Sequence, residues 1–188
     1  MLNLVLGAGE LGSAIASHTG IDKVVFTGSS RTGRRVMESA STNLKRLTLE
    51  LGGNDAGIVL PDIDVEAMAP KLFAACFHNN GQTCAALKRL YVHESIYDDV
   101  AEAIAVQARQ VVVGDGLDED TQLGPIQNLA QLEIVKSLAQ DAKDQGGNFL
   151  TGGNQIDRPG YFFEPTVVTG LSNGSRLVDE EPFGPIVP

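Results

Sequence analysis

The sequence predicts an α/β fold with a mostly parallel sheet and flanking helices. Strand-like and helix-like segments alternate along all 188 residues, the order expected of repeated strand–helix–strand units. Residues 44–51 have a period of two, with Thr48 and Glu50 on one face and three leucines on the other. Residues 72–77 place apolar side chains on one helical stripe. Both periodicities in one chain favour the α/β class.

The elements follow in chain order. Strands are expected at 2–6, 23–27, 44–51, 56–60, 89–92, 149–151 and 162–168, and helices at 10–18, 31–40, 64–79, 95–110 and 128–145. The first strand is expected because residues 1–6 are mostly apolar and end abruptly at a glycine. In the helix over 64–79, Pro70 either introduces a kink or marks the true start. Ser95 is expected to cap the helix over 95–110, whose first turn holds acids that complement the helix dipole.

Composition excludes several classes of function. The chain has 14 Lys and Arg against 24 Asp and Glu, so its formal charge of −10 repels nucleic acid. No segment is apolar for long enough to cross a bilayer, so no membrane partner is expected. Cys76 and Cys84 match no zinc pattern and the three histidines are scattered, so no metal is expected. Two reduced thiols favour a cytoplasmic protein, and Cys76 is expected in the core.

A carboxylate and a thiol stand out, each beside glycine. Glu50 begins the segment Glu50-Leu51-Gly52-Gly53, and Cys84 ends the segment Gly81-Gln82-Thr83-Cys84. This arrangement is typical of a cysteine nucleophile with a separate acid/base, and it indicates covalent catalysis on a carbonyl.

Two glycine-rich turns are possible phosphate sites. The turn over residues 7–12 has the spacing of a dinucleotide fingerprint, but the acid expected at the end of the next strand is absent, so a structural turn is an equal alternative. The turn from Gly28 to Gly33 lacks the lysine of a P-loop, which argues against nucleotide hydrolysis. It still offers a helix N-terminus with Ser29, suited to a phosphate that is bound and not transferred.

Five motifs together resemble the NAD(P)-dependent aldehyde dehydrogenase superfamily. They are Phe26-Thr27-Gly28-Ser29, Glu50-Leu51-Gly52-Gly53, Phe77 through Cys84, Leu123-Gly124-Pro125, and Glu180-Glu181-Pro182-Phe183-Gly184-Pro185. Their order and spacing match the family over essentially the whole chain. The resemblance implies an aldehyde-dehydrogenase-like fold and the oxidation of an aldehyde to a carboxylic acid with NAD or NADP.

The resemblance also assigns roles to single residues. Cys84 would attack the aldehyde to give a thiohemiacetal and then a thioester, with its amide as one oxyanion donor, and Glu50 would be the general base. The residues assigned to the cofactor are Gly28 and Ser29 at the pyrophosphate, Leu51 and Phe183 at the nicotinamide, and Glu181 at its ribose. Ser30 and Asn54 depart from the commonest residues of the family, at positions outside the chemistry.

By the same resemblance the chain is truncated at both ends. Residues 1–52 correspond to the C-terminal part of the NAD(P)-binding domain and residues 53–188 to most of the thiol-bearing catalytic domain. The second oxyanion donor and the residue that selects NAD or NADP would lie outside it. We therefore expect weak or no dehydrogenase activity from the isolated chain.

Two alternatives stay open for this chain. The first is a non-catalytic fragment with a structural or association role, such as a homo-oligomer or self-association through the truncated cofactor domain. The second is hydrolysis of activated esters by the thiolate, which needs no hydride acceptor. The identity of the aldehyde is not readable from the sequence.

Overall fold

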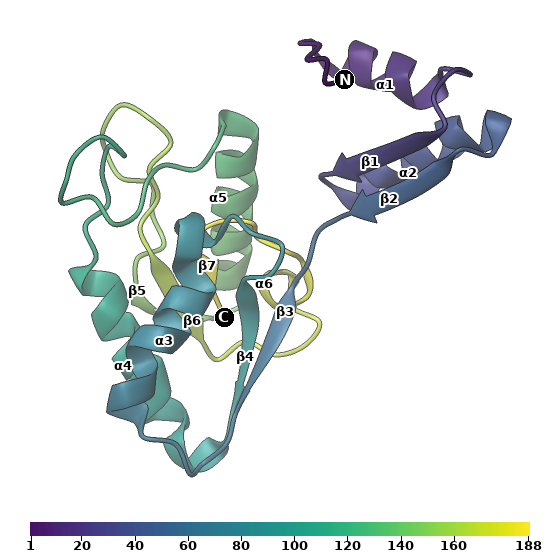
Figure 1. The fold of residues 1–188 in the computed structure, drawn as a ribbon. Coiled ribbons are helices and arrows are strands. Elements are labelled where there is room, and N and C mark those ends of the chain that lie inside the picture. The colour runs from purple at the N-terminus through teal and green to yellow at the C-terminus, as the bar shows by residue number, and fades with distance from the viewer. The chain divides into compact units, whose positions relative to one another are not determined.

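The computed structural model describes all residues from Met1 to Pro188. Two compact units make up the chain, Met1–Gly52 and Gly53–Pro188. Each contains helices and parallel strands, as Figure 1 shows, so the predicted α/β class is confirmed.

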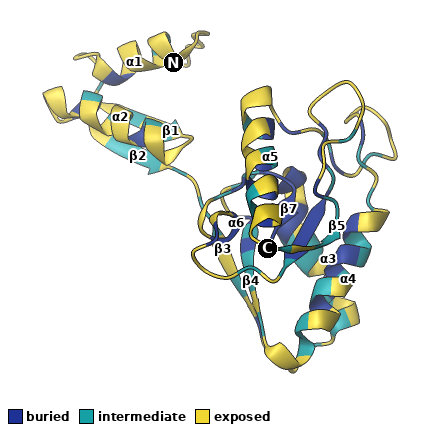
Figure 2. Cartoon of the chain, turned by 180° about the vertical axis from the view of Figure 1, so that it is seen from behind, coloured by how far each residue is buried: buried dark blue, intermediate teal, exposed yellow.

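The first unit consists of two helices and a parallel strand pair. Its elements are α1 (Gly9–Ser17), β1 (Lys23–Thr27), α2 (Ser30–Ala40), the short helix η1 (Ser41–Asn43) and β2 (Arg46–Glu50). The strands run in register from Lys23 opposite Arg46 to Thr27 opposite Glu50. Most side chains of this unit are exposed (Figure 2), and Ala16, Gly33, Ala40 and Lys45 are its only buried residues.

The second unit contains the remaining elements. In chain order they are β3 (Asp55–Val59), α3 (Val65–Phe77), η2 (His78–Gly81), β4 (Leu87–Val92), η3 (Glu94–Ile96), α4 (Tyr97–Gln110), α5 (Leu129–Asp144), β5 (Asn148–Thr151), β6 (Thr166–Thr169), α6 (Arg176–Asp179) and β7 (Ile186–Val187). Strands β3 and β4 are parallel, β6 is parallel to β7, and β5 is antiparallel to β6. The expectation of mostly parallel pairing therefore holds.

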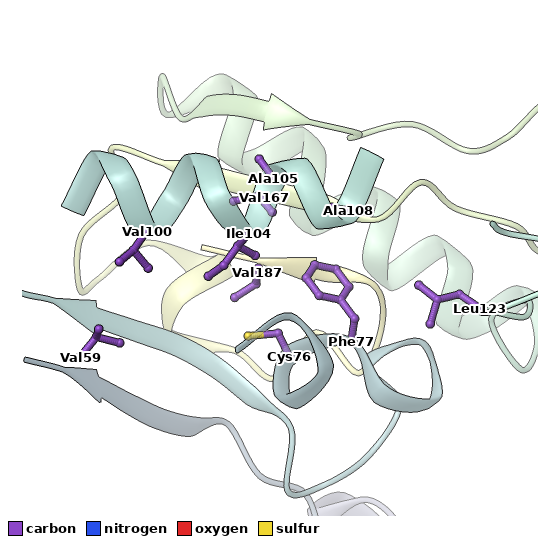
Figure 3. Close-up of a cluster of buried hydrophobic side chains, with 10 residues drawn as sticks. All are labelled: Val59, Cys76, Phe77, Val100, Ile104, Ala105, Ala108, Leu123, Val167 and Val187. Carbon is purple, nitrogen blue, oxygen red and sulfur yellow. The ribbon is translucent and has the colours of Figure 1, made fainter. Parts of the chain in front are cut away.

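The core of this unit lies on both faces of β6 and β7. Val167 and Val187 belong to one apolar cluster with residues of α3 and α4, which Figure 3 shows in close-up. Their chain neighbours Val168 and Ile186 belong to a second cluster with residues of α5. Adjacent strand residues point to opposite faces, so β6 and β7 are buried on both sides. This double burial gives the second unit a firm frame.

Cys76 lies in the first of these clusters with none of its surface exposed. Burial raises the pKa of its thiol to about 11, although the nearby Lys88 acts in the opposite direction. The prediction of a core thiol is confirmed.

Several local predictions are wrong. Residues 1–8 form no strand, because the parallel pair of the first unit contains only β1 and β2 and a strand needs a hydrogen-bonded neighbour. Helix α3 begins at Val65, capped by Asp64, so Pro70 lies inside the helix and does not begin it. Ser95 is not the cap of α4, because its amide donates to the His93 side chain in the preceding short helix.

The elements predicted near the end of the chain also differ from the observed ones. The strand predicted over 162–168 is shorter and begins at Thr166, directly after Pro165, whose missing N–H cannot join a strand ladder. The short elements α6 and β7 were not predicted, because four and two residues are too few to establish a periodicity. None of the helices is both long and apolar enough to span a membrane.

Candidate active site

Cys84 follows a left-handed turn at the end of α3. The residues Asn79, Asn80 and Gly81 have φ values of 51°, 60° and 69° in succession. Asparagine and glycine are the residues that adopt this region at least cost. The turn ends the helix and leads into the loop before β4. In this loop Cys84 is exposed as a free thiol, whereas Cys76 is fully buried.

The two asparagine side chains of this turn differ in their hydrogen bonding. The Asn79 amide nitrogen Nδ2 donates to the Gln82 carbonyl at 3.0 Å, and the Gln82 N–H donates back to the Asn79 carbonyl at 3.1 Å. Asn80 is 2% exposed, and neither its Oδ1 nor its Nδ2 has a partner within the chain. A left-handed residue with unpaired buried polar atoms costs free energy, and such costs are concentrated at functional sites.

Gln82 ties the thiol loop to the Leu123-Gly124-Pro125 motif. Its Nε2 donates to the Pro125 carbonyl at 3.3 Å, and its Oε1 accepts from the Gln127 N–H at 2.8 Å. Two segments about 40 residues apart in the sequence are therefore joined through one side chain, using both ends of its amide. The sequence located both motifs but not this bond between them.

Gly53 lies between Cys84 and Glu181. Its N–H donates to Glu181 Oε1 at 2.9 Å. A Cβ atom on Gly53 would collide with the Cys84 carbonyl oxygen, so only glycine permits this close approach. Burial raises the pKa of the Glu181 carboxyl, and the bond from the Gly53 N–H partly offsets that effect. Glu181 is thereby placed beside the backbone of the loop that carries Cys84.

The two adjacent glutamates of the fifth motif are in different environments. Glu180 pairs with the Arg176 guanidinium, with Nε to Oε1 at 2.7 Å, and this bond lowers the pKa of its carboxyl. Glu181 turns inward to Gly53. Phe183 has a φ of 42°, and the Gln131 Nε2 of α5 donates to the Pro182 carbonyl at 2.8 Å. Helix α5 therefore helps to fix the loop that carries Glu181 and Phe183.

The remaining predicted site residues belong to the first unit, at the carboxyl edge of its strand pair. Gly28 and Ser29 follow β1, while Glu50 ends β2 and Leu51 follows it. The Gly28 N–H donates to the Glu50 carbonyl at 3.0 Å, which joins the two strand ends. In parallel α/β sheets this edge is where ligands bind. The exposed Glu50 side chain and Ser29 are thus grouped there.

Ser29 is the N-cap of α2. Its Oγ accepts from the Thr32 N–H at 3.3 Å and donates to the Thr32 hydroxyl at 3.1 Å. This cap leaves the first amides of α2 at the carboxyl edge of β1, where they can bind an anion.

A cavity of about 520 Å³ opens between α1, β1 and α2. Gly9 and Gly12 of α1 line it opposite Val24 and Phe26 of β1, and a Cβ on either glycine would meet nothing within 4 Å. The apolar walls and the free space beside the glycines fit a flat ring system, and the start of α2 fits its phosphates. The residues present therefore fit a dinucleotide cofactor.

The fold and the site together define an α/β protein with an exposed, glycine-flanked cysteine in one unit and a nucleotide-type cavity in the other. The model of the aldehyde dehydrogenase family matches residues 1–188. The chain belongs to the aldehyde dehydrogenase family.

Two curated relatives illustrate the similarity. The chain is 42% identical over 188 residues to a probable aldehyde dehydrogenase of a Pseudomonas species, covering 100% of this chain and 38% of the relative. It is 40% identical over 190 residues to the peroxisomal aminoaldehyde dehydrogenase 1 of Pisum sativum, again covering 100% and 38%. The chain thus spans little more than a third of the length of these relatives.

Two solved structures have the same fold. One is betaine aldehyde dehydrogenase from Staphylococcus aureus in complex with NAD+, at a TM-score of 0.92 and 35% identity, covering 97% of this chain and 37% of the other. The second is a mutant of aldehyde dehydrogenase C from Pseudomonas syringae with NAD+ and octanal, at a TM-score of 0.93 and 36% identity, covering 97% and 39%.

Proposed function

We propose that the chain is the thiol-bearing part of an NAD(P)-dependent aldehyde dehydrogenase, with Cys84 as nucleophile and Glu50 as general base. Residues 1–52 would be the C-terminal part of the cofactor domain and residues 53–188 the catalytic domain. The observation that carries the proposal is the contrast between the two thiols: Cys84 is exposed in the loop that follows a left-handed turn, and Cys76 is fully buried.

The covalent steps follow from the chemistry of a thiolate. Cys84 Sγ adds to the aldehyde carbon, giving a thiohemiacetal whose oxygen is stabilised by the Cys84 N–H. Bound NAD+ or NADP+ would supply the acceptor for the hydride that leaves that carbon, and the hydroxyl proton would be lost. A thioester remains on Cys84. Glu50 then removes a proton from water, whose oxygen attacks the thioester carbonyl, and the acid leaves as Sγ is released.

We propose a cofactor contact for five residues and for the first turn of α2. Ser29, Gly28 and the first turn of α2 would bind the pyrophosphate, because they offer free amides and a positive helix end. The Leu51 carbonyl would accept from the nicotinamide amide. Glu181 would bind the ribose hydroxyls, for which its carboxylate must exchange or share the bond from the Gly53 N–H, and Phe183 would pack beside the ring.

Ester hydrolysis tests the nucleophile without any cofactor. With p-nitrophenyl acetate we expect an acetyl group on the peptide that contains Cys84 and none on the peptide that contains Cys76. Cys84→Ser should abolish the label and Cys76→Ser should retain it, while Glu50→Gln should slow the loss of the label. If the acetyl group on Cys84 is lost equally fast in Glu50→Gln, Glu50 is not the general base. If no acetyl group appears on Cys84, Cys84 is not the nucleophile.

Dehydrogenation is the second test. Formation of NADH or NADPH from an aldehyde should depend on Cys84, and we expect it to be weak or absent in the 188-residue chain and present in a longer protein that contains it. A reducing compartment such as the cytoplasm would keep Cys84 reduced.

An association role is the second candidate. Leu2, Leu4 and Leu6 are 83–96% exposed, and Val25 of β1 is 64% exposed. A two-stranded sheet with exposed apolar residues favours pairing with another chain, so we propose self-association through residues 1–52. Sedimentation should then give an oligomer for residues 1–188. A monomer at micromolar concentration would exclude self-association through residues 1–52.

A further inference from the structure

Lys88 is a buried lysine in the strand that follows the nucleophile. It lies in β4, four residues after Cys84, and is 1% exposed. It lies beside Cys76 and Phe77, both fully buried, so its surroundings are largely apolar. The side chain has no ion pair. A lysine in such a place is rare because its desolvation is costly.

The Lys88 ammonium joins two segments through backbone carbonyls. Its Nζ donates to the Cys76 carbonyl near the end of α3 at 2.8 Å, to the Gly184 carbonyl at 2.9 Å and to the Ile186 carbonyl at 3.4 Å. It also lies 5.4 Å from the centre of the Phe77 ring. An ammonium has three N–H donors and no acceptor, so these three carbonyls match its full capacity.

The left-handed turn before the nucleophile lies directly on this amine. Gly81, at φ 69°, is buried, and a Cβ there would collide with Lys88 Nζ and with the Gly184 carbonyl oxygen. The turn, the amine and the segment that carries Glu181 and Phe183 are therefore packed without intervening space. Gly81 permits the contact, and Lys88 holds both sides of it.

We propose that Lys88 is a positioning residue for the thiol loop, whose ammonium fixes the Gly81 turn, and with it Cys84, against the segment 181–186. The proposal rests on the function proposed above for Cys84. A methionine, one atom shorter, would fill most of the space but could bond none of the three carbonyls. On this view the lysine sets the distance between two motifs.

The titratable groups around Lys88 are Cys76 of α3 and Glu181 of the facing loop. Burial lowers the pKa of its ammonium from 10.5 to about 8, against the opposing effects of Cys76 and then Glu181. Loss of a proton leaves two N–H donors for three carbonyls, with a lone pair directed at an oxygen. The position of the Gly81 turn should therefore respond to pH near this value.

Hydrogen exchange measures the proposed link without measuring catalysis. In Lys88→Met we expect exchange of the amides in 79–86 and 181–187 to be about tenfold faster than in the original chain, as expected for the loss of about one hydrogen bond's free energy per segment. The matched control is Lys45→Met. Lys45 is the other buried lysine, and its Nζ donates to the Ala16 and His18 carbonyls in the first unit. This control should leave 79–86 unchanged.

A second measurement keeps the proposal testable if Lys88→Met does not fold. In the unmodified chain, NMR should show the Lys88 side chain titrating near pH 8, with the Gly81 and Gly184 amide resonances shifting at the same midpoint. Equal exchange in 79–86 for Lys88→Met and the original chain, or Gly81 and Gly184 resonances that do not follow Lys88, would overturn the proposal. A chain that exchanges as expected but fails the ester test would retain it as a structural link and refute the function of Cys84.

Discussion

The pH dependence of stability gives a quantitative test of the buried lysine. Burial places the pKa of Lys88 at about 8, compared with 10.5 in the unfolded chain. One pKa unit corresponds to about 1.4 kcal/mol, so keeping the ammonium in the interior costs about 3 kcal/mol at neutral pH. Between the two values the unfolded state binds more protons, so the free energy of unfolding contributed by this group rises with pH.

The size of the change can be worked out for a convenient range. Between pH 7 and pH 9 the cost of burying the ammonium falls by nearly one pKa unit. The free energy of unfolding of wild type should therefore rise by about 1.3 kcal/mol relative to that of Lys88→Met over this range. With a urea m-value of roughly 2 kcal/mol/M, the difference between their midpoints should move by about 0.6 M. The buried Cys76 thiol acts in the opposite sense, but only from pH 9 to its folded pKa of about 11.

The assay can be confined to the second unit. The chain has no tryptophan, and its three tyrosines, Tyr91, Tyr97 and Tyr161, all lie in residues 53–188. Tyrosine fluorescence in urea therefore reports this unit. Lys45→Met is the control and should leave the midpoint unchanged. A constant difference between wild type and Lys88→Met from pH 7 to pH 9 would refute the reasoning.

Three further predictions concern the thiol loop. A thiol reagent should modify one cysteine in the folded protein and two in urea, since Cys76 is fully buried; two fast-reacting thiols without urea would contradict the structure. Gly53→Ala should lower stability by roughly 1–3 kcal/mol, because its Cβ would collide with the Cys84 carbonyl, and an unchanged urea midpoint would disprove this. Gln82→Ala removes two bonds to the 125–127 segment and should lower the free energy of unfolding by about 1–2 kcal/mol; Gln140→Ala, on the exposed side of α5, is its control and should have little effect.

Some elements could be predicted from their own residues, whereas others depend on partners elsewhere in the chain. The strand over Lys23–Thr27 was predicted with its observed bounds, because its β-branched residues end at a glycine. The segment over 2–6 is just as apolar but forms no strand, since no pattern in the segment itself reveals whether a partner strand exists. Pro70 shows a related limit: the side-chain cap of Asp64 set the start of α3, and a proline signal six residues into the helix did not.

The site was predictable as a set of motifs but not as a set of contacts. The glycine-flanked thiol and carboxylate identified Cys84 and Glu50, because nucleophile chemistry restricts the residue type. Their assigned roles stay predictions. Gln82 could have been suspected from its place in the motif, yet its partners near Pro125 depend on how distant segments fold together. Lys88 gave no such signal, because the strand predicted over 89–92 begins after it, whereas the observed β4 begins at Leu87.

The motif around the thiol therefore combines two kinds of residue. Cys84 is exposed and free to react, whereas Gly81 and Lys88 are buried and contact only other parts of the protein. Gly81 must be glycine because the amine and a carbonyl occupy the space of its side chain. If Cys84 performs the chemistry, as proposed, and the other two hold its loop, a change at Lys88 should alter hydrogen exchange and pH response while Cys84 remains present. A purely chemical role for the whole motif would predict no such separation.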